Sequence, residues 1–514
     1  MTDTARLADE IIAHGVTRLF GIPGSGVTLS LIDALEKRGI PFHLTHFEGA
    51  GALMAATVGK LSGRAGVSLS IKGPGLANTL SGIAAAWFES YPLVHLTEAY
   101  PPGAPASLAH KRMDQASLVA PIAKASRFSA KDGPGFTAMA HFACAEQPGP
   151  VLFELAPSAP AKAEALPAAA MLRPDAAKAY ELLRNCNHPI VIAGALALRA
   201  GLGAALAKLN VPVFSTAAAK GIVDERAHNA AGLFTGVGEG YTPEYVLMHR
   251  ADLVIGIGLT ASESLKTAPF RAPYLAIEAV ETPGTDAFAP EARLGLGDAV
   301  AAFDHIAACN WGLDELRDIL FRLQARMEEG FLPGACFAAI DNAFARRVRM
   351  VMDTGYFCTI GEHAWRAASA DLCLLSGQGR YMGTALPMAL GAALHDPSLS
   401  TVMVAGDGGI AMYLAEAKLA VQQKLPLLIV LMTDNMFGSV RTRAIKDGLT
   451  QKPLTMDGKS WVPVFDALGI PGTRAETIGQ VNEALSDWMP SGGPAFLEIP
   501  FEPDAYEAMV GGIR

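Results

Sequence analysis

The stretch that decides the fold runs from Gly406 to Gly438 and reads GDGGIAMYLAEAKLAVQQKLPLLIVLMTDNMFG. Apolar runs at Thr401 to Ala405 and Pro426 to Met432 predict two buried strands, and the residues between them, about Tyr413 to Gln423, predict a helix. A strand, a crossover helix and a second strand form a right-handed unit whose two strands are parallel. The stretch therefore predicts part of a parallel α/β sheet.

Two aspartates follow these strands. Asp407 comes directly after the first strand and Asp434 after the second, so we expect both at the carboxyl edge of the sheet, where open α/β sheets bind ligands. Mg²⁺ is usually held by one or two carboxylates together with phosphate oxygens of the ligand. The backbone at Gly406, Gly408 and Gly409 can approach a diphosphate closely, and the amides of a following helix would point at it. The glycines alone would favour an ordinary turn with solvated aspartates, whereas the full spacing predicts a magnesium diphosphate site.

The composition bounds the class of protein. The 514 residues suggest about three domains, and 51% apolar with 18% charged residues is typical of packed α/β layers. A net charge of -9 without a basic stripe argues against a nucleic-acid partner. The first residues lack a cationic start with an apolar core, and no apolar run approaches the ~20 residues that span a bilayer. Six scattered cysteines without CxxC spacing suit a reducing compartment, so we expect a soluble, cytoplasmic protein without a membrane partner.

Alternating strand-like and helix-like stretches predict three doubly wound parallel-sheet domains of the α/β class, at residues 1–160, 173–312 and 333–514. The Ala- and Pro-rich stretch Ala156 to Pro174 is typical of a linker, and the charged stretch Leu313 to Glu329 predicts a connecting helix. The expected strands are Arg18 to Gly21 and those near His43, Val67 and Leu93; Pro189 to Ala193, Pro212 to Ser215, Leu253 to Ile257 and Tyr274 to Ile277; and Val348 to Met352, Leu372 to Leu375, Thr401 to Val404, Leu427 to Met432 and Ala495 to Ile499.

The motif and the three-part order resemble the thiamine diphosphate enzymes of the pyruvate oxidase, acetolactate synthase and 2-oxo acid decarboxylase superfamily, which includes benzoylformate decarboxylase and benzaldehyde lyase. The resemblance implies a pyrimidine-binding, a central and a diphosphate-binding domain in that order, with thiamine diphosphate and Mg²⁺ as cofactors. It assigns Asp407, Asp434 and the backbone carbonyl of Met436 to the metal. The family usually has Asn where Asp434 stands. Specific motifs occur in the outer two domains only.

The resemblance also assigns residues to the organic cofactor. Glu48, in LTHFEGAG, matches the carboxyl group that hydrogen-bonds the pyrimidine ring nitrogen. Met382 matches the bulky side chain that keeps the cofactor bent, and Gly383 beside it lets the ring approach the backbone. Ordinary structural roles are a first-turn helix acid for Glu48 and a core residue for Met382. The other cofactor positions are Gly406, Asp407, Gly408, Gly409, Asp434, Met436, Phe437, Gly438 and Pro74.

Three further residues are predicted on the substrate side. Lys72 precedes the loop GPGLANT at a place where relatives carry a small hydroxyl residue or a His. It would hold a second anionic group of the substrate, donate a proton, or be a solvated charge at a strand end. Gln115 aligns with a substrate-facing Gln of benzaldehyde lyase-like relatives, and Ser25 with a substrate-contacting Ser of benzoylformate decarboxylase-like ones. A surface amide and a turn serine are the structural alternatives.

Together these features imply an enzyme that cleaves or forms a carbon–carbon bond next to a carbonyl, by decarboxylating a 2-oxo acid or transferring its acyl carbanion to an aldehyde or 2-oxo acid. The alternatives are an acetolactate synthase-like carboligase, a lyase or hydrolase without decarboxylation, and a non-catalytic nucleotide-binding or regulatory homologue. Relatives build each site from two subunits, so we expect a homodimer or homotetramer. Kinship allows FAD in the central domain, but no motif there predicts it. Gly49, and Tyr356 and Phe357 after Gly355, depart from the family pattern.

Overall fold

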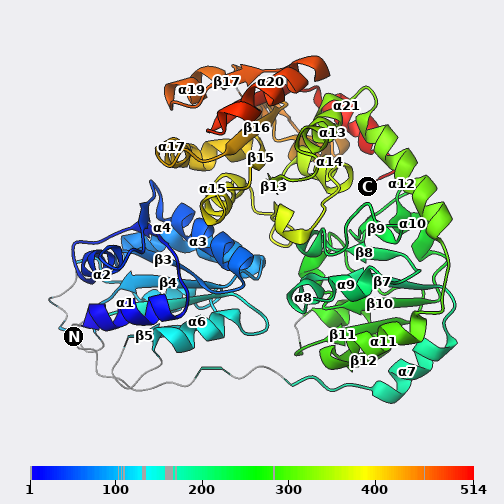
Figure 1. Ribbon diagram of the computed structural model, residues 1–514, viewed down its shortest axis with the longest axis horizontal. Helices are drawn as coiled ribbons and strands as arrows, with labels where there is room; N and C mark the ends of the chain where they lie inside the picture. The colour runs from blue at the N-terminus through cyan, green and yellow to red at the C-terminus, as the bar shows by residue number, and fades with distance from the viewer. Residues whose placement is uncertain are drawn as a thin grey trace. The chain divides into compact units, whose positions relative to one another are not determined.

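The computed structural model describes residues 3–513, apart from 102–103, 106, 108–109, 130–134, 157–165, 168–170, 282–283 and 457. The described residues form three six-stranded sheets, each flanked by helices (Figure 1). All strand pairs in these sheets are parallel, so the predicted class is confirmed. The predicted linker, Ala156 to Pro174, lies mostly outside the described residues.

The first sheet has the order β2-β1-β3-β4-β6-β5. Its strands are β1 (Leu19–Ile22), β2 (Phe42–Leu44), β3 (Gly66–Ser70), β4 (Leu93–Glu98), β5 (Ser126–Phe128) and β6 (Pro150–Leu155). Its helices are α1 (Asp3–Ala13), α2 (Val27–Glu36), α3 (Glu48–Ser62), α4 (Pro74–Phe88), α5 (Gln115–Val119) and α6 (Phe136–Cys144). Small residues let α3 lie close to the sheet, since a side chain at Gly51 would come within 2.8 Å of the backbone of Gly21.

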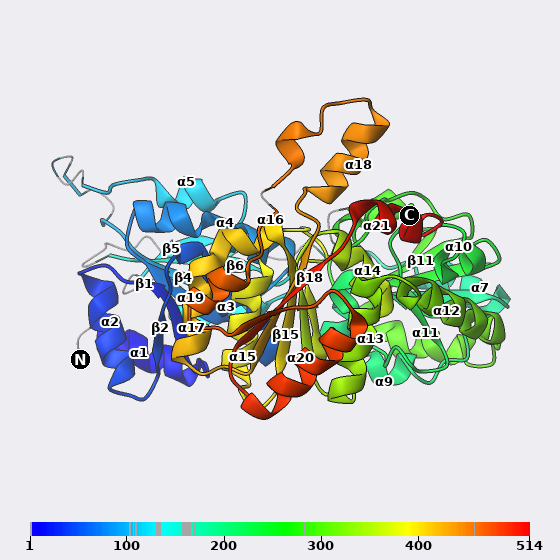
Figure 2. The same ribbon diagram turned by 90° about the horizontal axis from the view of Figure 1, so that it is seen from above.

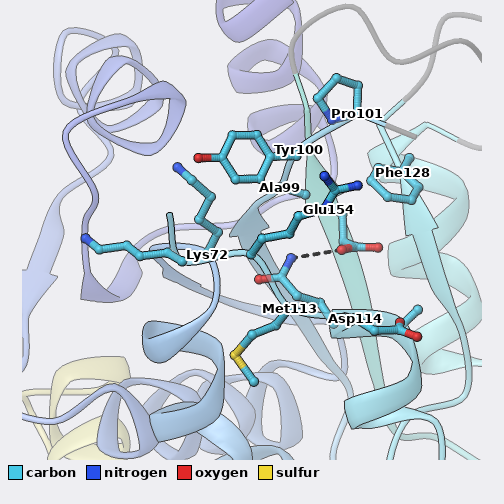
Figure 3. Close-up of a pocket in the computed structure, with 12 residues that line it drawn as sticks. Lys72, Ala99, Tyr100, Pro101, Met113, Asp114, Phe128 and Glu154 are labelled. Carbon is cyan, nitrogen blue, oxygen red and sulfur yellow. Dashed lines mark hydrogen bonds between the residues drawn. The ribbon is translucent and has the colours of Figure 1, made fainter. Parts of the chain in front are cut away.

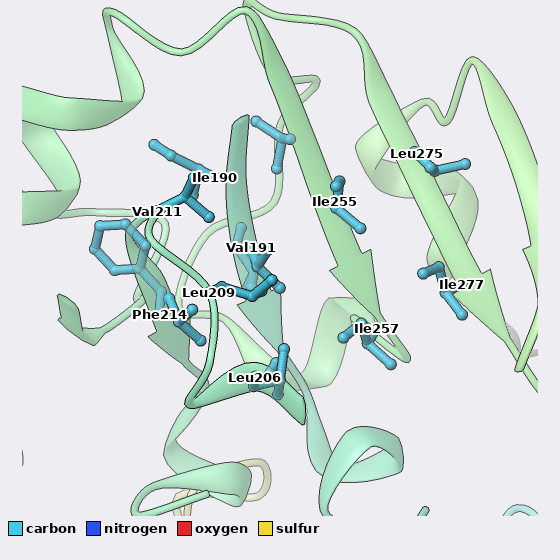
Figure 4. Packing of buried hydrophobic residues seen from close by; sticks show 14 of the residues in the cluster. Ile190, Val191, Leu206, Leu209, Val211, Phe214, Ile255, Ile257, Leu275 and Ile277 are labelled. Carbon is cyan, nitrogen blue, oxygen red and sulfur yellow. The ribbon is translucent and has the colours of Figure 1, made fainter. Parts of the chain in front are cut away.

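The second sheet has the order β12-β11-β10-β7-β8-β9. Its strands are β7 (Pro189–Ala193), β8 (Val213–Ser215), β9 (Ala230–Leu233), β10 (Leu253–Ile257), β11 (Tyr274–Glu278) and β12 (Ala292–Gly295). The helices are α7 (Ala176–Asn185), α8 (Ala195–Arg199), α9 (Gly203–Leu206), η1 (Ala217–Ala219), α10 (Pro243–Met248), η2 (Ala261–Glu263), η3 (Thr285–Phe288), η4 (Leu296–Asp298), α11 (Ala299–Ile306) and α12 (Leu313–Glu328). Figure 4 shows how β-branched and Leu side chains of these strands pack into one buried core.

The third sheet has the order β14-β13-β15-β16-β18-β17. Its strands are β13 (Arg349–Met352), β14 (Cys373–Leu375), β15 (Thr401–Gly406), β16 (Leu427–Thr433), β17 (Gly472–Arg474) and β18 (Ala495–Pro500). The helices are α13 (Leu332–Phe344), α14 (Tyr356–Ala364), η5 (Ala370–Leu372), α15 (Ala385–His395), α16 (Asp407–Ile410), η6 (Ala411–Glu416), α17 (Ala417–Gln422), α18 (Gly438–Lys446), η7 (Lys452–Leu454), α19 (Val462–Ala467), α20 (Ile478–Ser491) and α21 (Pro503–Val510). Figure 2 shows α18 standing clear of the sheet from which it emerges.

The chain divides into two compact units. The first comprises residues 1–168 together with 386–398 and 413–425, and the second comprises the rest of the chain. The middle and last sheets thus share one unit, while the three predicted domain ranges remain a proposal. No helix within the described ranges is both long enough and apolar enough to cross a bilayer.

The expected strands all form, but the predicted helix from Tyr413 to Gln423 is wrong as one element. The structure has a single turn, α16, then η6 and then α17. The backbone of Tyr413 has φ -129°, which interrupts the helical path. Five strands were not predicted. They are β5, β6, β9, β12 and β17, of which β6 is a fully buried strand interrupted in sequence by Glu154.

Candidate active site

Asp407 occupies the predicted place at the end of β15, as the first residue of α16. Its side chain is 4% exposed. One carboxylate oxygen accepts hydrogen bonds from the Thr433 hydroxyl at 2.7 Å and from the Asn435 amide at 2.8 Å. Burial raises the pKa of Asp407 in spite of these bonds. The carboxylate is therefore held rigidly at the sheet edge by the end of the neighbouring strand.

Asp434 follows β16, which is the parallel neighbour of β15 in the register Gly406 to Met432. The prediction that both aspartates reach the same sheet edge is thus confirmed. Burial, and next the negative charge of Asp407, raise the pKa of Asp434 to about 6. A buried and a partly buried carboxyl group, the first of which disfavours ionisation of the second, form a site that a divalent cation would stabilise.

Several glycines near Asp407 lie so close to neighbouring side chains that a larger residue would not fit there. A Cβ atom at Gly408 would lie 2.9 Å from the ring of Phe437, and one at Gly438 would lie 2.4 Å from the ring of Tyr356. A Cβ atom at Gly409 would lie 2.0 Å from a carboxylate oxygen of Asp353. The main chain of this turn is therefore closely packed against these side chains, and only glycine fits at these positions.

Asp353, which the sequence did not reveal as a site residue, joins two loops of the site. It follows β13 and is 1% exposed. Both of its oxygens accept the Gly383 amide at 2.9 Å, and the carboxylate also accepts the amides of Thr384 and Ala385. It thereby fixes the backbone beside Met382 and supports the turn at Gly409. An acid directly after a predicted buried strand was the available signal.

Asp353 predicts a pH-dependent stability. Burial raises the pKa of this carboxyl from 3.8 to about 7. Between about pH 4 and 7 the folded protein keeps a proton that the unfolded chain has lost, so the stabilisation is complete below about pH 4 and is lost as the pH rises through 7. The free energy of unfolding of the wild type, compared with that of Asp353→Asn, should therefore fall by about 1–3 kcal/mol between about pH 5 and about pH 8. Urea unfolding at several pH values measures this difference, and parallel profiles would refute it. Asp371→Asn, at an exposed acid of the same domain, is the control.

Two aromatic residues, Tyr356 and Phe357, follow Gly355. Tyr356 begins α14 and stacks on Tyr506 with ring centroids 3.6 Å apart. Its hydroxyl donates to the Gly438 carbonyl at 2.5 Å and also contacts the Thr442 hydroxyl. Tyr356 therefore ties the start of α14 to the start of α18, so its role here is to hold the loop after Asp434.

Met382 lies in the loop before α15 and is partly buried. Gly383 beside it has φ +86°, a conformation that favours glycine, and a Cβ atom there would come within 2.8 Å of the Met412 sulfur. The predicted roles of both residues toward a cofactor remain predictions. Their backbone is nevertheless fixed through Asp353, as a supporting position requires.

Glu48 is the first residue of α3, at the predicted strand-to-helix turn, and is 8% exposed. The Asn78 side chain donates to its carboxylate at 3.1 Å. The turn itself is held by Glu416, a buried acid that accepts the amides of His46 and Phe47, each at 2.9 Å. Sequence reasoning missed Glu416, although an acid inside an otherwise apolar helical stretch was a signal of buried hydrogen bonding.

Lys72 follows β3, and its ammonium lies 3.3 Å from the Glu98 carboxylate and 5.2 Å from the centre of the Tyr100 ring. Glu98 is buried and also accepts the hydroxyl of Thr28 at 2.7 Å. Burial acts to raise the pKa of Glu98, but the hydrogen bonds from Thr28 and Lys72 outweigh it, so this pKa lies below its usual value. Lys72 is therefore a paired, partly buried charge.

Gln115 and Ser25 differ in their surroundings. Gln115 is 4% exposed; its oxygen accepts the Gly73 amide at 2.7 Å, and its nitrogen donates to Glu154 at 2.9 Å. The amide is engaged within the protein, which favours a positioning role for Gln115. Ser25 is exposed, in the loop that packs over Glu98. Contact of either residue with a substrate remains a prediction.

A cavity of about 400 Å³ opens beside Lys72 at the carboxyl edge of the first sheet (Figure 3). Three cationic residues contribute to its wall, namely Lys72, Lys111 and Arg112. Glu154 forms part of the opposite wall, and Tyr100 contributes an aromatic ring. Burial raises the pKa of Glu154, and Lys72 is paired with Glu98. The wall also includes the cations Lys111 and Arg112 and the acid Asp114. The cavity suits a small polar molecule that carries an anionic group.

The donor set fits a metal held through a diphosphate. Among the described residues, no cluster of three or more His, Cys, Asp or Glu side chains is placed to hold a metal ion. Asp407 and Asp434 provide two carboxylates, which is the number that Mg²⁺ uses when phosphate oxygens and water complete its shell. The closely packed glycine turn beside them suits the phosphate groups.

Comparison with known families gives three matches in order along the chain. Residues 1–118 match the family described as thiamine pyrophosphate enzyme, N-terminal TPP binding domain. Residues 176–279 match the central domain of the same enzymes, and residues 353–499 match their C-terminal TPP binding domain. Together the matches cover well over half of the chain and include both Glu48 and the two aspartates.

Several curated proteins are similar over most of their length. An acetolactate synthase of Bacillus subtilis is 26% identical, with 96% of this chain and 92% of the relative covered. A catabolic acetolactate synthase of Raoultella terrigena is 27% identical, with 96% and 94% covered. A probable 2-ketoarginine decarboxylase of Pseudomonas aeruginosa is also 27% identical, with 89% and 85% covered. The similarity thus includes relatives of two different activities.

Proposed function

This chain belongs to the thiamine diphosphate-dependent enzymes of the acetolactate synthase and pyruvate oxidase superfamily, and from that premise we propose that it is a Mg²⁺-dependent 2-oxo acid decarboxylase or carboligase. The observation that carries the proposal is the pair Asp407 and Asp434 at the ends of adjacent parallel strands, beside a closely packed glycine turn. Such a pair is what a metal diphosphate needs.

In this proposal Asp407, Asp434 and the Met436 carbonyl hold Mg²⁺, and the backbone around Gly408 receives the diphosphate. Bound thiamine diphosphate supplies a nucleophilic carbon and an electron sink. Glu48 holds a proton at the ring nitrogen of the aminopyrimidine, and its burial beside Asn78 fixes the carboxyl in one orientation. The protein would therefore contribute three things to the reaction, namely metal ligation, a proton held at the pyrimidine ring and a shaped pocket.

Each complete site is proposed to need two subunits, the first domain of one and the third domain of another, as in a homodimer or homotetramer. Leu44 and Phe47, which flank the turn before Glu48, are 59% and 37% exposed. Exposed apolar side chains of this size are typical of surfaces that become covered on assembly. This exposure supports an interface close to Glu48.

An acetolactate synthase-like carboligase, with a second 2-oxo acid as acceptor, is the alternative function, and the cations in the cavity beside Lys72 support it. A carboligase must hold the carboxylate of an acceptor 2-oxo acid, whereas a decarboxylase for a diacid must hold a second anionic group of its substrate. The cations Lys72, Lys111 and Arg112 suit either carboxylate. The two functions differ in the product, which is a 2-hydroxy-3-oxo acid in the first case and an aldehyde in the second.

A screen of 2-oxo acids and aldehydes, with CO₂ release and products measured together, tests this proposal. We expect CO₂ release that requires thiamine diphosphate. Lys72→Met should raise KM about tenfold to a hundredfold for a diacid, or lower carboligation by a similar factor while CO₂ release persists, because a buried charge pair with the anion is lost. Lys60→Met, at a lysine that lies over the Tyr91 ring, is the control. Equal losses on monoanionic and dianionic substrates, with carboligation unchanged, would exclude an anion-holding role for Lys72.

A further inference from the structure

The central sheet has the topology that in other proteins binds dinucleotides. Strands β7 and β10 are neighbours at the centre of the sheet. After β7 the chain continues outward to β8 on one side, and after β10 it continues outward to β11 on the other side. In open α/β sheets this switch in direction opens a crevice at the carboxyl ends of the two strands, where the ligand binds. Here the crevice would lie between Gly194, which follows β7, and Gly258, which follows β10.

A carboxylate of the protein itself occupies this place. Glu263 is 4% exposed and accepts the amide of Ala195, the first residue of α8, at 3.0 Å. The same oxygen accepts the hydroxyl of Thr216, after β8, at 2.5 Å. In dinucleotide-binding sheets the amide after the first strand faces a phosphate of the ligand. Glu263 takes the hydrogen bond that a phosphate would take, and its negative charge would repel one.

The loops after β7 and β10 also lie too close together to leave space for a ligand between them. The Gly194 amide donates to the Ile257 carbonyl at 3.0 Å. A Cβ atom at Gly194 would lie 2.7 Å from the Gly258 carbonyl oxygen and 3.0 Å from Glu263, and one at Gly258 would lie 2.2 Å from the Leu196 Cβ atom. The residues present therefore do not fit the pyrophosphate of FAD or NAD, which needs open backbone at this turn.

The third domain covers the remaining side of the crevice. The Ser262 hydroxyl donates to the Gln378 side-chain oxygen at 2.9 Å. A Cβ atom at Gly377 would lie 2.8 Å from Ala217, so this loop lies directly against η1. The same loop leads to Met382, and the amide of Tyr381 within it donates to Ser376 at 2.7 Å. The closed crevice thus forms a base on which the loop carrying Met382 rests.

We infer that the central domain does not bind FAD or another dinucleotide, and that the buried Glu263 carboxylate has replaced the ligand as the group that closes the switch-point crevice. The domain then serves to position the loop of Met382. The inference rests on residues of the central domain and its neighbouring loop, so it stands or falls independently of the reaction catalysed.

The first test uses the purified wild-type protein with Mg²⁺ and thiamine diphosphate present. We expect no flavin absorbance after purification, and no heat of binding when FAD or ADP is titrated in a calorimeter. Stoichiometric flavin, or binding of FAD or ADP in the micromolar range, would overturn the inference. Titration of thiamine diphosphate in the same cell is a separate reading, so failure of the proposed function and failure of this inference are distinguishable.

The second test concerns the carboxylate. Glu263→Ala should lower the melting temperature by several degrees, because the Ala195 amide and the Thr216 hydroxyl lose their acceptor. Formate should recover part of this loss, compared with chloride at equal ionic strength, because it restores a carboxylate to the vacated space. The wild type should melt equally in both salts. A variant as stable as wild type, or equal melting of the variant in formate and chloride, would contradict the role given to Glu263. Should the variant fail to fold, the wild-type titration still decides.

Discussion

Glu48→Gln should lower turnover by roughly a hundredfold to ten-thousandfold while binding of thiamine diphosphate and Mg²⁺ stays nearly unchanged. The glutamine side chain has the shape of the carboxyl group that it replaces, so its oxygen can still accept the Asn78 side-chain amide, which lies 3.1 Å from the Glu48 carboxylate. It cannot share a proton with a pyrimidine nitrogen as a carboxyl group does. The effect therefore appears in kcat on a substrate identified by the screen, and calorimetry measures cofactor binding.

The matched control is Glu89→Gln, at a buried glutamate that ends α4 in the same domain. It reports the general cost of changing a buried acid and should leave kcat close to wild type. Wild-type turnover in Glu48→Gln would remove this residue from the catalytic machinery. A loss of cofactor binding equal to the loss of turnover would assign Glu48 to binding alone.

Asp407→Asn should weaken the binding of thiamine diphosphate by about a hundredfold or more, and chelation of Mg²⁺ by EDTA should do the same to the wild type. The variant keeps an oxygen for the Thr433 hydroxyl and the Asn435 amide, but it loses the negative charge that a divalent cation needs. The measurement is the rise in melting temperature on adding the cofactor, since a ligand that binds the folded state raises stability with its affinity.

Readdition of Mg²⁺ should restore the melting-temperature rise in the wild type but not in Asp407→Asn. Asp396→Asn, at a partly exposed acid that accepts hydrogen bonds from Ser398, should behave as wild type. An equal cofactor-induced rise with and without EDTA would show that the diphosphate is held without a metal. That result would refute the assignment of Asp407 and Asp434 as ligands.

Features that depend on local pattern could be predicted from the amino-acid sequence. Apolar runs gave the strands β15 and β16, and the short crossover between parallel neighbours required Asp407 and Asp434 to reach one sheet edge. The position of Glu48 followed in the same way from a strand-to-helix turn. These features could be predicted because strand periodicity and parallel connection depend on residues that are close together in the chain.

The burial of the other acids, and the groups that they hold, became known from the packed fold. In sequence, Glu98 and Glu263 look like ordinary surface acids, and the signals at Asp353 and Glu416 do not say which groups these acids hold. Their burial depends on donors distant in the chain: the Ala195 amide lies 68 residues from Glu263, and the His46 amide lies 370 residues from Glu416. A buried carboxylate is tolerated only where such donors converge, and convergence over these separations is a property of the packed fold. For the same reason the closed crevice of the central domain, and the pairing of Lys72 with Glu98, could not be read from the chain alone.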